Sequence, residues 1–280
     1  METNVELARL VSIALELRRD LARMFYISHS GHFASSLSCI DIFTVLYFGG
    51  IVDKSRQQAT NRDRVILSKG HASAALYVAL AKAGYFPRKE LSTFYQDGSR
   101  LAGHPSVDLP GIETPTGSLG HGICFATGTA LAAKIDNAIY RTYVVMGDGE
   151  LQEGSVYEAA TFAGREKLSS LTVILDYNGL QASDRIENIA PLGDIAMQWR
   201  LYGWNVVEVD GHNYTELQQM LNQTKKSTEK PNLIIAHTVK GKGICLAENN
   251  PAWHSRAPRG DEWEVVCHDL GMTREELEML

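Results

Sequence analysis

Residues 143–150 read YVVMGDGE, and this stretch decides the fold class. An apolar run of the buried-strand type leads directly into Gly147-Asp148-Gly149 and then towards a helical stretch over 154–165. The next apolar run, residues 171–175, ends in DYNGL at 176–180. Strands that alternate with helices in this rhythm indicate an α/β fold, in which a mostly parallel sheet carries helices on both faces.

The same alternation extends in both directions from this stretch. The predicted helices span 5–26, 37–48, 72–84, 122–134, 154–165, 195–202 and 215–225, and the further strands span 65–67, 206–209 and 233–236. Residues 240–260 are rich in Gly, Asn and Pro, which predicts a long ordered loop of the functional kind. A helical tail is expected over 261–268 and 273–280. Because no repeat or linker interrupts this order, we expect a single domain over 1–280.

Composition excludes several classes of protein. The formal net charge of −6 lacks the basic excess that non-specific nucleic-acid binding needs, and it gives an anionic membrane nothing to attract. The four cysteines contain no CxxC pair, so we expect neither a disulfide framework nor a structural zinc site. The sequence shows no signal peptide and no apolar stretch of the length of a membrane span. We therefore expect a cytoplasmic protein without membrane or nucleic-acid partners.

Glycine precedes histidine more often than composition predicts. Five Gly-His pairs occur where about one is expected. Glycine allows a ligand to approach the backbone closely, and histidine exchanges protons near neutral pH. Each pair alone is an ordinary turn, but the set predicts a polar pocket that handles protons. The histidines concerned are His32, His71, His104, His121 and His212.

The turns that follow the two central strands predict a site for a cation and a phosphate group. Adjacent parallel strands place Asp148 and Asn178 at the same edge of the sheet, where α/β proteins bind ligands. A carboxylate, an amide oxygen, a backbone carbonyl and phosphate oxygens suit Mg²⁺, or alternatively Ca²⁺. Gly147 and Gly149 leave backbone amides free to face phosphate oxygens. The alternative is that Asn178-Gly179 is simply a turn that ends a strand.

A family resemblance follows from motifs that occur in a fixed order. The GDG turn followed about thirty residues later by Asn resembles the thiamin diphosphate fingerprint. Five segments together resemble the amino-terminal, diphosphate-binding domain of transketolase over roughly Gly31 to His254. These segments are SKGHA at 68–72, GHP at 103–105, TGSLG at 116–120, GDGELQEG at 147–154 and DGH at 210–212.

The resemblance implies roles for individual residues. Glu153 resembles a buried acid that links the family's cofactor sites across an interface, although it could be a helix N-terminal charge. The implied metal ligands are Asp148, Asn178 and the main-chain carbonyl of Leu180. The implied thiamin diphosphate contacts are His71, Gly117, Leu119, Gly147, Asp148, Gly149, Glu150 and Asn178. The implied catalytic residues, which would line the substrate channel or sit by the diphosphate, are His32, His71, His104 and His254.

The sequence departs from the family pattern at two places on the substrate side. Phe33 replaces the proline that usually follows the first Gly-His pair, and His121 replaces a common glutamine. In addition, the sequence up to Leu280 shows no second α/β unit. The family's pyrimidine-binding domain, which carries the glutamate that activates the cofactor, is therefore expected on a partner chain.

The resemblance implies the amino-terminal subunit of a split transketolase. Such a subunit moves a two-carbon ketol unit from a ketose phosphate to an aldose phosphate once the carboxy-terminal subunit completes the site. The family also implies a homodimeric core joined to two partner chains. Two alternatives stay open: a related thiamin enzyme that uses another sugar, such as a branched pentulose phosphate, or makes 1-deoxyxylulose 5-phosphate; and a non-catalytic cofactor-binding paralogue.

Overall fold

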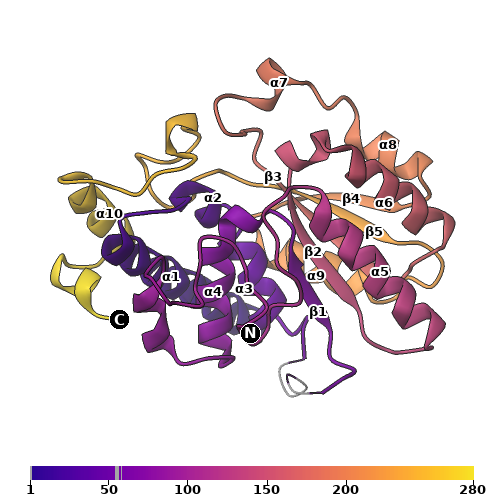
Figure 1. Cartoon of the computed structure of the whole chain (residues 1–280), viewed down its shortest axis with the longest axis horizontal. Helices are drawn as coiled ribbons and strands as arrows, with labels where there is room; N and C mark the ends of the chain where they lie inside the picture. Colours follow the sequence, from indigo (N-terminus) through magenta and orange to yellow (C-terminus); the bar gives the residue numbers. More distant parts are fainter. Residues whose placement is uncertain (1, 54–56, 58) are drawn as a thin grey trace.

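Five parallel strands form the centre of the molecule (Figure 1), and the computed structural model describes residues 2–53, 57 and 59–280. The strand order is β1-β2-β3-β5-β4, so the sheet is entirely parallel and the predicted α/β class is confirmed. The strands are β1 (Arg64–Leu67), β2 (Thr142–Gly147), β3 (Leu171–Tyr177), β4 (Asn205–Asp210) and β5 (Asn232–His237).

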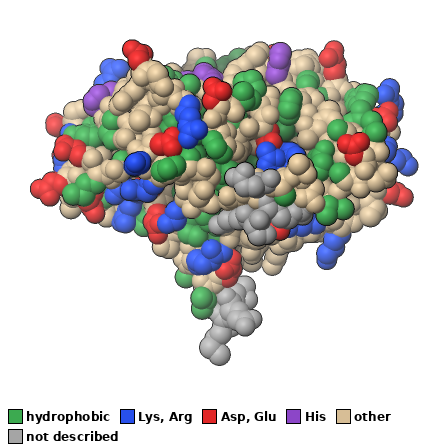
Figure 2. Space-filling model, turned by 60° about the horizontal axis from the view of Figure 1, so that its bottom comes forward, with side chains coloured by type: hydrophobic (Ala, Val, Ile, Leu, Met, Phe, Trp, Pro, Cys, Tyr) green, Lys and Arg blue, Asp and Glu red, His purple; other side chains and the backbone are tan. Residues whose placement is uncertain are grey.

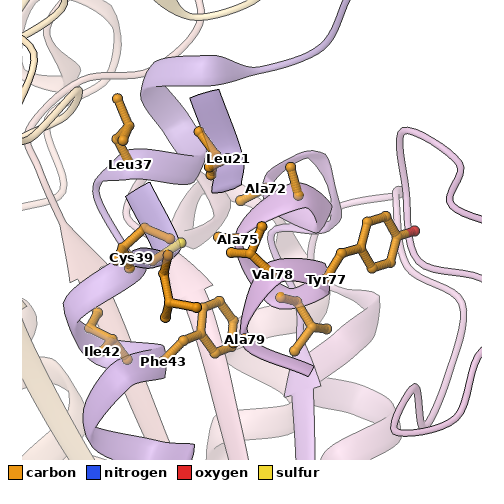
Figure 3. Close-up of a cluster of buried hydrophobic side chains, with 14 of the residues drawn as sticks. Leu21, Leu37, Cys39, Ile42, Phe43, Ala72, Ala75, Tyr77, Val78 and Ala79 are labelled. Atoms are coloured by element: carbon orange, nitrogen blue, oxygen red, sulfur yellow. The ribbon is translucent and has the colours of Figure 1, made fainter. Parts of the chain in front are cut away.

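One face of the sheet is covered by the larger hydrophobic cluster. Tyr143 and Val145 of β2 point into it, as do Ile234 and Ala236 of β5. Figure 3 shows part of this cluster, where Cys39 and Phe43 point towards side chains of the helix that begins at Ser73. The helices on this side are α1 (Glu2–Ser28), α2 (Phe33–Leu37), α3 (Ile40–Phe48), α4 (Ser73–Ala83), α9 (Tyr214–Thr224) and α10 (Glu262–Leu270).

The opposite face packs against a second cluster. Because side chains alternate along a strand, Val144 and Met146 of β2 point to this side. Trp199 and Trp204 are buried here, with ring centroids 4.7 Å apart. The helices are α5 (His121–Ile135), α6 (Gly154–Arg165) and α8 (Ile195–Leu201), which Figure 1 shows across the sheet from α1, α3 and α4. Both faces are therefore covered, as the sequence predicted.

The structure differs from the predicted elements in a few places. The helix predicted over 37–48 begins three residues later, as α3, and a separate short helix, α2 (Phe33–Leu37), precedes it. Between the two helices, Ser38 donates its hydroxyl to the buried Asp176 over 2.6 Å. The tail over 273–280 forms only the 3₁₀ turn η6 (Glu275–Glu278). The elements not predicted are the short helix α7 (Ile186–Ile189) and the 3₁₀ turns η2 (Gly70–Ala72), η3 (Arg88–Thr93), η4 (Gly149–Gln152) and η5 (Pro251–Trp253).

The described residues bear on the two predictions about membranes and charged partners. Among the described residues, no helix combines the length and apolar character needed to span a bilayer. On the face seen in Figure 2, acidic and basic side chains are interspersed rather than gathered by sign.

Candidate active site

The residues implied to bind the cofactor and metal or to be catalytic all line one cavity of about 220 Å³, where the carboxyl ends of the central strands meet. They come from segments more than 200 positions apart in the sequence, which the parallel sheet brings to a common edge. The predicted residues in the lining are His32, His71, His104, Gly117, Leu119, Gly147, Asp148, Gly149, Glu150, Asn178, Leu180 and His254.

The two turns after β2 and β3 are in direct contact. Gly147 lies opposite Asp176 in the β2–β3 register, so residues 148–150 and 178–180 leave the sheet side by side. The backbone N–H of Gly179 donates to Oδ2 of Asp148 over 2.5 Å, and that of Gly149 donates to Oδ1 over 2.9 Å. Burial, together with the nearby Asp176 carboxylate, raises the pKa of Asp148 to about 6 despite these hydrogen bonds. A cation close to such a buried carboxylate stabilises its ionised form.

Glu150 is the buried carboxylate that joins the GDG turn to the TGSLG turn. It accepts hydrogen bonds from the hydroxyl of Ser68, from the Gly120 N–H at 2.7 Å and from the Gly147 N–H at 3.3 Å. Burial raises its pKa above the ordinary value. Glu153, which the resemblance implied to be buried, is exposed on this chain. Within the chain it is therefore Glu150 that holds the two turns together.

Four imidazole rings form one wall of the cavity. The ring centroid of His32 lies 5.2 Å from that of His71, 5.4 Å from that of His254 and 6.3 Å from that of His104. Burial lowers the pKa of His32 to about 4 and that of His254 to about 3, and nearby cations add to both shifts. Burial lowers the pKa of His71 in the same way. These three imidazoles are therefore neutral at physiological pH and can donate and accept hydrogen bonds.

Two buried lysines were not predicted from the sequence. The ammonium of Lys69 lies 2.5 Å from Oδ2 of Asp176 and also donates to Ser35 and Ser38. Lys240 donates to Nδ1 of His254 over 2.8 Å and lies 3.4 Å from the carbonyl oxygens of Leu180 and Gln181. Both lysines follow buried strands closely, Lys69 after β1 and Lys240 after β5, and this position could have identified them.

The pKa values of these two lysines are shifted in opposite directions. Asp176 raises the pKa of Lys69 even though burial opposes it. Burial lowers the pKa of Lys240 to about 8, and Lys69 contributes to that shift. In the described part of the chain, no ion pair joins Lys240 to a carboxylate. Lys240 is thus a buried cation that faces the cavity without a carboxylate in contact.

Several polar atoms at the cavity have no hydrogen-bond partner among the residues that the structure describes. They are Nδ1 of His32, Oγ of Ser35 and Nε2 of Gln181. Buried polar groups are normally hydrogen-bonded, so an orphaned set around one cavity is the pattern expected of a site for a polar ligand. Ser35, Gln181 and Ala182 complete the lining and were also missed by the sequence reasoning.

The Gly-His prediction was only partly correct. His32, His71 and His104 line the cavity, but His121 is exposed at the start of α5, and His212 lies in a separate network. Phe33 is buried among aromatic rings, with its centroid 5.1 Å from that of Phe25. The two departures from the family pattern therefore fall outside the cavity lining.

Comparison with known proteins identifies the family. Residues 17–279 match the family model described as transketolase, thiamine diphosphate binding domain. The chain belongs to the transketolase family. It is 39% identical to one of the subunits of the apulose-4-phosphate transketolase of Phocaeicola vulgatus, over 93% of both chains. It is 38% identical to the 6-deoxy-6-sulfo-D-fructose transketolase subunit SqwG of a Clostridium species, over 86% of this chain and 88% of that protein.

Solved transketolases have the same fold over most of this chain. The transketolase of Campylobacter jejuni superposes with a TM-score of 0.85 at 31% identity, covering 94% of this chain and 43% of that one. A Pichia stipitis transketolase in complex with sedoheptulose 7-phosphate superposes with the same TM-score, covering 96% of this chain and 42% of that one. The present chain thus spans about two fifths of the solved transketolases and nearly the whole of the Phocaeicola vulgatus relative.

Proposed function

We propose that this chain, as one domain over 1–280, is the amino-terminal subunit of a two-chain transketolase. With thiamin diphosphate and Mg²⁺, the complete enzyme transfers a two-carbon ketol unit from a ketose phosphate to an aldose phosphate. The observation that carries the proposal is the meeting of every implied cofactor and substrate residue in one cavity. The near full-length match to relatives named as transketolase subunits supports a two-chain enzyme.

The cation would be held by Asp148, the amide oxygen of Asn178 and the carbonyl of Leu180. All three donors are oxygens, which is the set that Mg²⁺ prefers. Within the described residues there is no cluster of three His, Cys, Asp or Glu side chains that could hold a metal. The chain therefore supplies only part of a coordination shell, and phosphate oxygens suit the remainder.

The diphosphate would be held by the polar groups around that cation. Lys240 offers a buried ammonium beside the Leu180 carbonyl, and Ser35 and Gln181 offer the orphaned side-chain atoms described above. His71 lies against His32 and His254 on the same wall. Because these donors are buried, each hydrogen bond to a phosphate oxygen is stronger than it would be at the surface.

The substrate side of the cavity is formed by neutral imidazoles. Bound thiamin diphosphate supplies the carbon nucleophile that carries the two-carbon unit. Since Lys240 donates to Nδ1 of His254, the proton of that ring is on Nε2. His254 therefore presents a donor to a sugar oxygen, and the neutral His32 and the more exposed His104 can form further hydrogen bonds with the substrate.

The exposed face of α5 fits self-association into a dimeric core. Phe125 and Ile135 are 46% and 69% exposed, and the exposed Gly128 between them allows another helix to approach closely. α5 packs directly against α6, so the two helices present one surface on the side of the sheet away from α1. The carboxy-terminal partner subunit would then cover the cavity and contribute the pyrimidine-binding half.

The proposal is tested by reconstitution. The purified chain is mixed with its candidate carboxy-terminal subunit, thiamin diphosphate and Mg²⁺, and ketol transfer between a ketose phosphate and an aldose phosphate is measured. We expect activity only with both chains, and we expect His104→Ala to reduce it while His121→Ala, outside the cavity, leaves it unchanged. Full turnover by the His104→Ala complex would refute a catalytic role for His104. A wild-type complex with no ketol transfer would leave the non-catalytic paralogue as the better description.

A second candidate concerns the sugar. The subunit relatives are named for apulose 4-phosphate and 6-deoxy-6-sulfo-D-fructose, which are a branched sugar phosphate and a sulfonated sugar. A panel of linear ketose phosphates, a branched pentulose phosphate and a sulfonated ketose, each with the same aldose acceptor, separates these options. Pyruvate in the same panel tests the synthesis of 1-deoxyxylulose 5-phosphate.

A further inference from the structure

A second buried polar network lies behind the loop that carries Lys240. Asp41 of α3 accepts two hydrogen bonds from Arg18 of α1, at 2.9 and 2.7 Å. Its Oδ1 also accepts from the hydroxyl of Tyr214 over 2.5 Å, and its Oδ2 lies 2.7 Å from Nδ1 of His212. None of these four residues lines the cavity. Burial opposes ionisation of Asp41, but Arg18 and His212 outweigh it and hold the pKa well below its usual range.

His212 connects this network to the loop after β5. Its Nε2 accepts the backbone N–H of Val239 over 2.8 Å. Since that nitrogen must be the acceptor, the ring proton is on Nδ1 and is donated to Asp41. The two ring nitrogens therefore make different hydrogen bonds: Nδ1 donates to the Asp41 carboxylate, and Nε2 accepts from the backbone N–H of Val239.

The loop is held on both sides of Lys240. Val239, which His212 fixes, comes immediately before it, and Arg18 donates through Nε to the carbonyl of Lys242 over 3.2 Å. The N–H of Gly241 donates to the carbonyl of Ala34 over 3.0 Å. The backbone around Lys240 is thus fixed at successive residues, and this fixed backbone directs the long side chain into the cavity.

We propose that His212, buttressed by Asp41 and Arg18, is a positioning residue for Lys240. The hydrogen bond from Val239 to Nε2 of His212 holds the Lys240 ammonium where it meets the diphosphate. The inference rests on the proposed function, because it takes Lys240 as a diphosphate contact. Without that hydrogen bond the segment gains freedom, and ordering it again costs cofactor affinity.

Two conservative substitutions each keep one of the two hydrogen bonds of the His212 ring and remove the other. The amide of His212→Gln reaches the place of Nε2 and can still accept from Val239. The amide of His212→Asn reaches the place of Nδ1 and can still donate to Asp41, but it leaves Val239 without its acceptor. For the two-chain complex with Mg²⁺, we expect the thiamin diphosphate Kd measured by calorimetry to rise about tenfold in His212→Asn. We expect it to stay within about twofold of wild type in His212→Gln.

A double-mutant cycle shows whether the effect passes through Lys240. If His212 acts by placing the ammonium, His212→Asn should no longer raise the Kd in a Lys240→Met background. Tyr214→Phe is the matched control, because it removes a hydrogen bond to Asp41 without touching Val239. It should lower the melting temperature and leave the Kd unchanged.

The outcomes distinguish failure of the proposed function from failure of the positioning role alone. A wild-type complex that binds no thiamin diphosphate overturns the proposed function and this inference with it. A wild-type complex that binds, with a Kd that His212→Asn leaves unchanged or that rises equally in the Lys240→Met background, overturns only the positioning role. A Kd raised in His212→Gln and normal in His212→Asn also overturns it, since the link to Asp41 would then be the one that matters.

Discussion

Replacement of Lys69 by methionine tests the electrostatics beneath the cavity. The side chains of Lys69 and Asp176 are 2% and 0% exposed, and their charged atoms are 2.5 Å apart. Removing one member of a fully buried ion pair costs about 3–5 kcal/mol, because the remaining charge has no solvent. Lys69→Met should therefore lower the free energy of unfolding at pH 7 by about that amount. For a chain of this size, the melting temperature should fall by roughly 6–10 °C.

The pH dependence of this loss has a definite sign. In the wild type, Lys69 holds the pKa of Asp176 below its ordinary value despite burial. That contribution to stability is present above the ordinary aspartate pKa of 3.8 and is lost as the pH falls. In the variant, burial instead raises the Asp176 pKa, so the folded state gains stability in acid and loses it as the pH rises. The stability difference between the two proteins should therefore widen as the pH rises above the ordinary aspartate pKa of 3.8.

Urea titration followed by tryptophan fluorescence measures the difference, since Trp199 and Trp204 are buried. Lys89→Met removes an exposed lysine and should have little effect. The double variant Lys69→Met with Asp176→Asn should recover most of the loss, because neither charge of this pair is then left without its partner. A loss below about 1 kcal/mol in Lys69→Met at pH 7, or a loss that does not depend on pH, would refute the reasoning.

Three further predictions concern other parts of the molecule. In the wild-type two-chain complex, Mg²⁺ and thiamin diphosphate at about 100 times Kd should raise the free energy of unfolding by about 2.7 kcal/mol and so raise the melting temperature. For Asp148→Asn, the melting temperature should no longer rise with these ligands. An equal rise in both proteins would contradict the metal assignment. Because the pKa of His32 is about 4 in the folded chain, unfolding of the isolated chain should become easier as the pH falls from 6.5 towards 4. His32→Asn should reduce that fall in thermal scans, and an unchanged pH profile would speak against a neutral buried ring. Gly164→Ala places a Cβ 1.7 Å from the carbonyl oxygen of Tyr202 and should destabilise by about 1–3 kcal/mol in urea titration, whereas Gly154→Ala, with nothing within 4 Å, should not.

The sequence predicted the fold because its signals are local. Each strand is a short apolar run bounded by turn residues, and each helix has its own period or cap. In the structure, Gly84 ends α4 in the left-handed conformation and the side chain of Asn213 caps α9, so both helices end at signals within their own segments. The contact of Ser38, between α2 and α3, with Asp176 was not predictable, because the two residues are 138 positions apart in the sequence.

Some features of the site could likewise be predicted from the sequence, and others could not. Asp148 and Asn178 could be paired because neighbouring strands of a parallel sheet end together. The burial of Glu150 within the chain could not be read from the sequence, since Glu150 and Glu153 both follow the GDG turn and only packing shows that Glu150 is the one enclosed by this chain. His212 follows glycine just as His32 does, yet β4 and β5 carry it away from the cavity and into contact with Asp41.

The buried ammonium of Lys240 makes this corner of the fold locally frustrated. It has lost its hydration and has gained only carbonyl and imidazole neighbours in exchange. An anion that binds in the cavity would pair with this ammonium, so binding of the anion would also stabilise the folded state. Counter-ions from the solvent cannot reach such a charge easily, and attraction of an anionic ligand should therefore persist at ionic strengths that would screen a surface lysine.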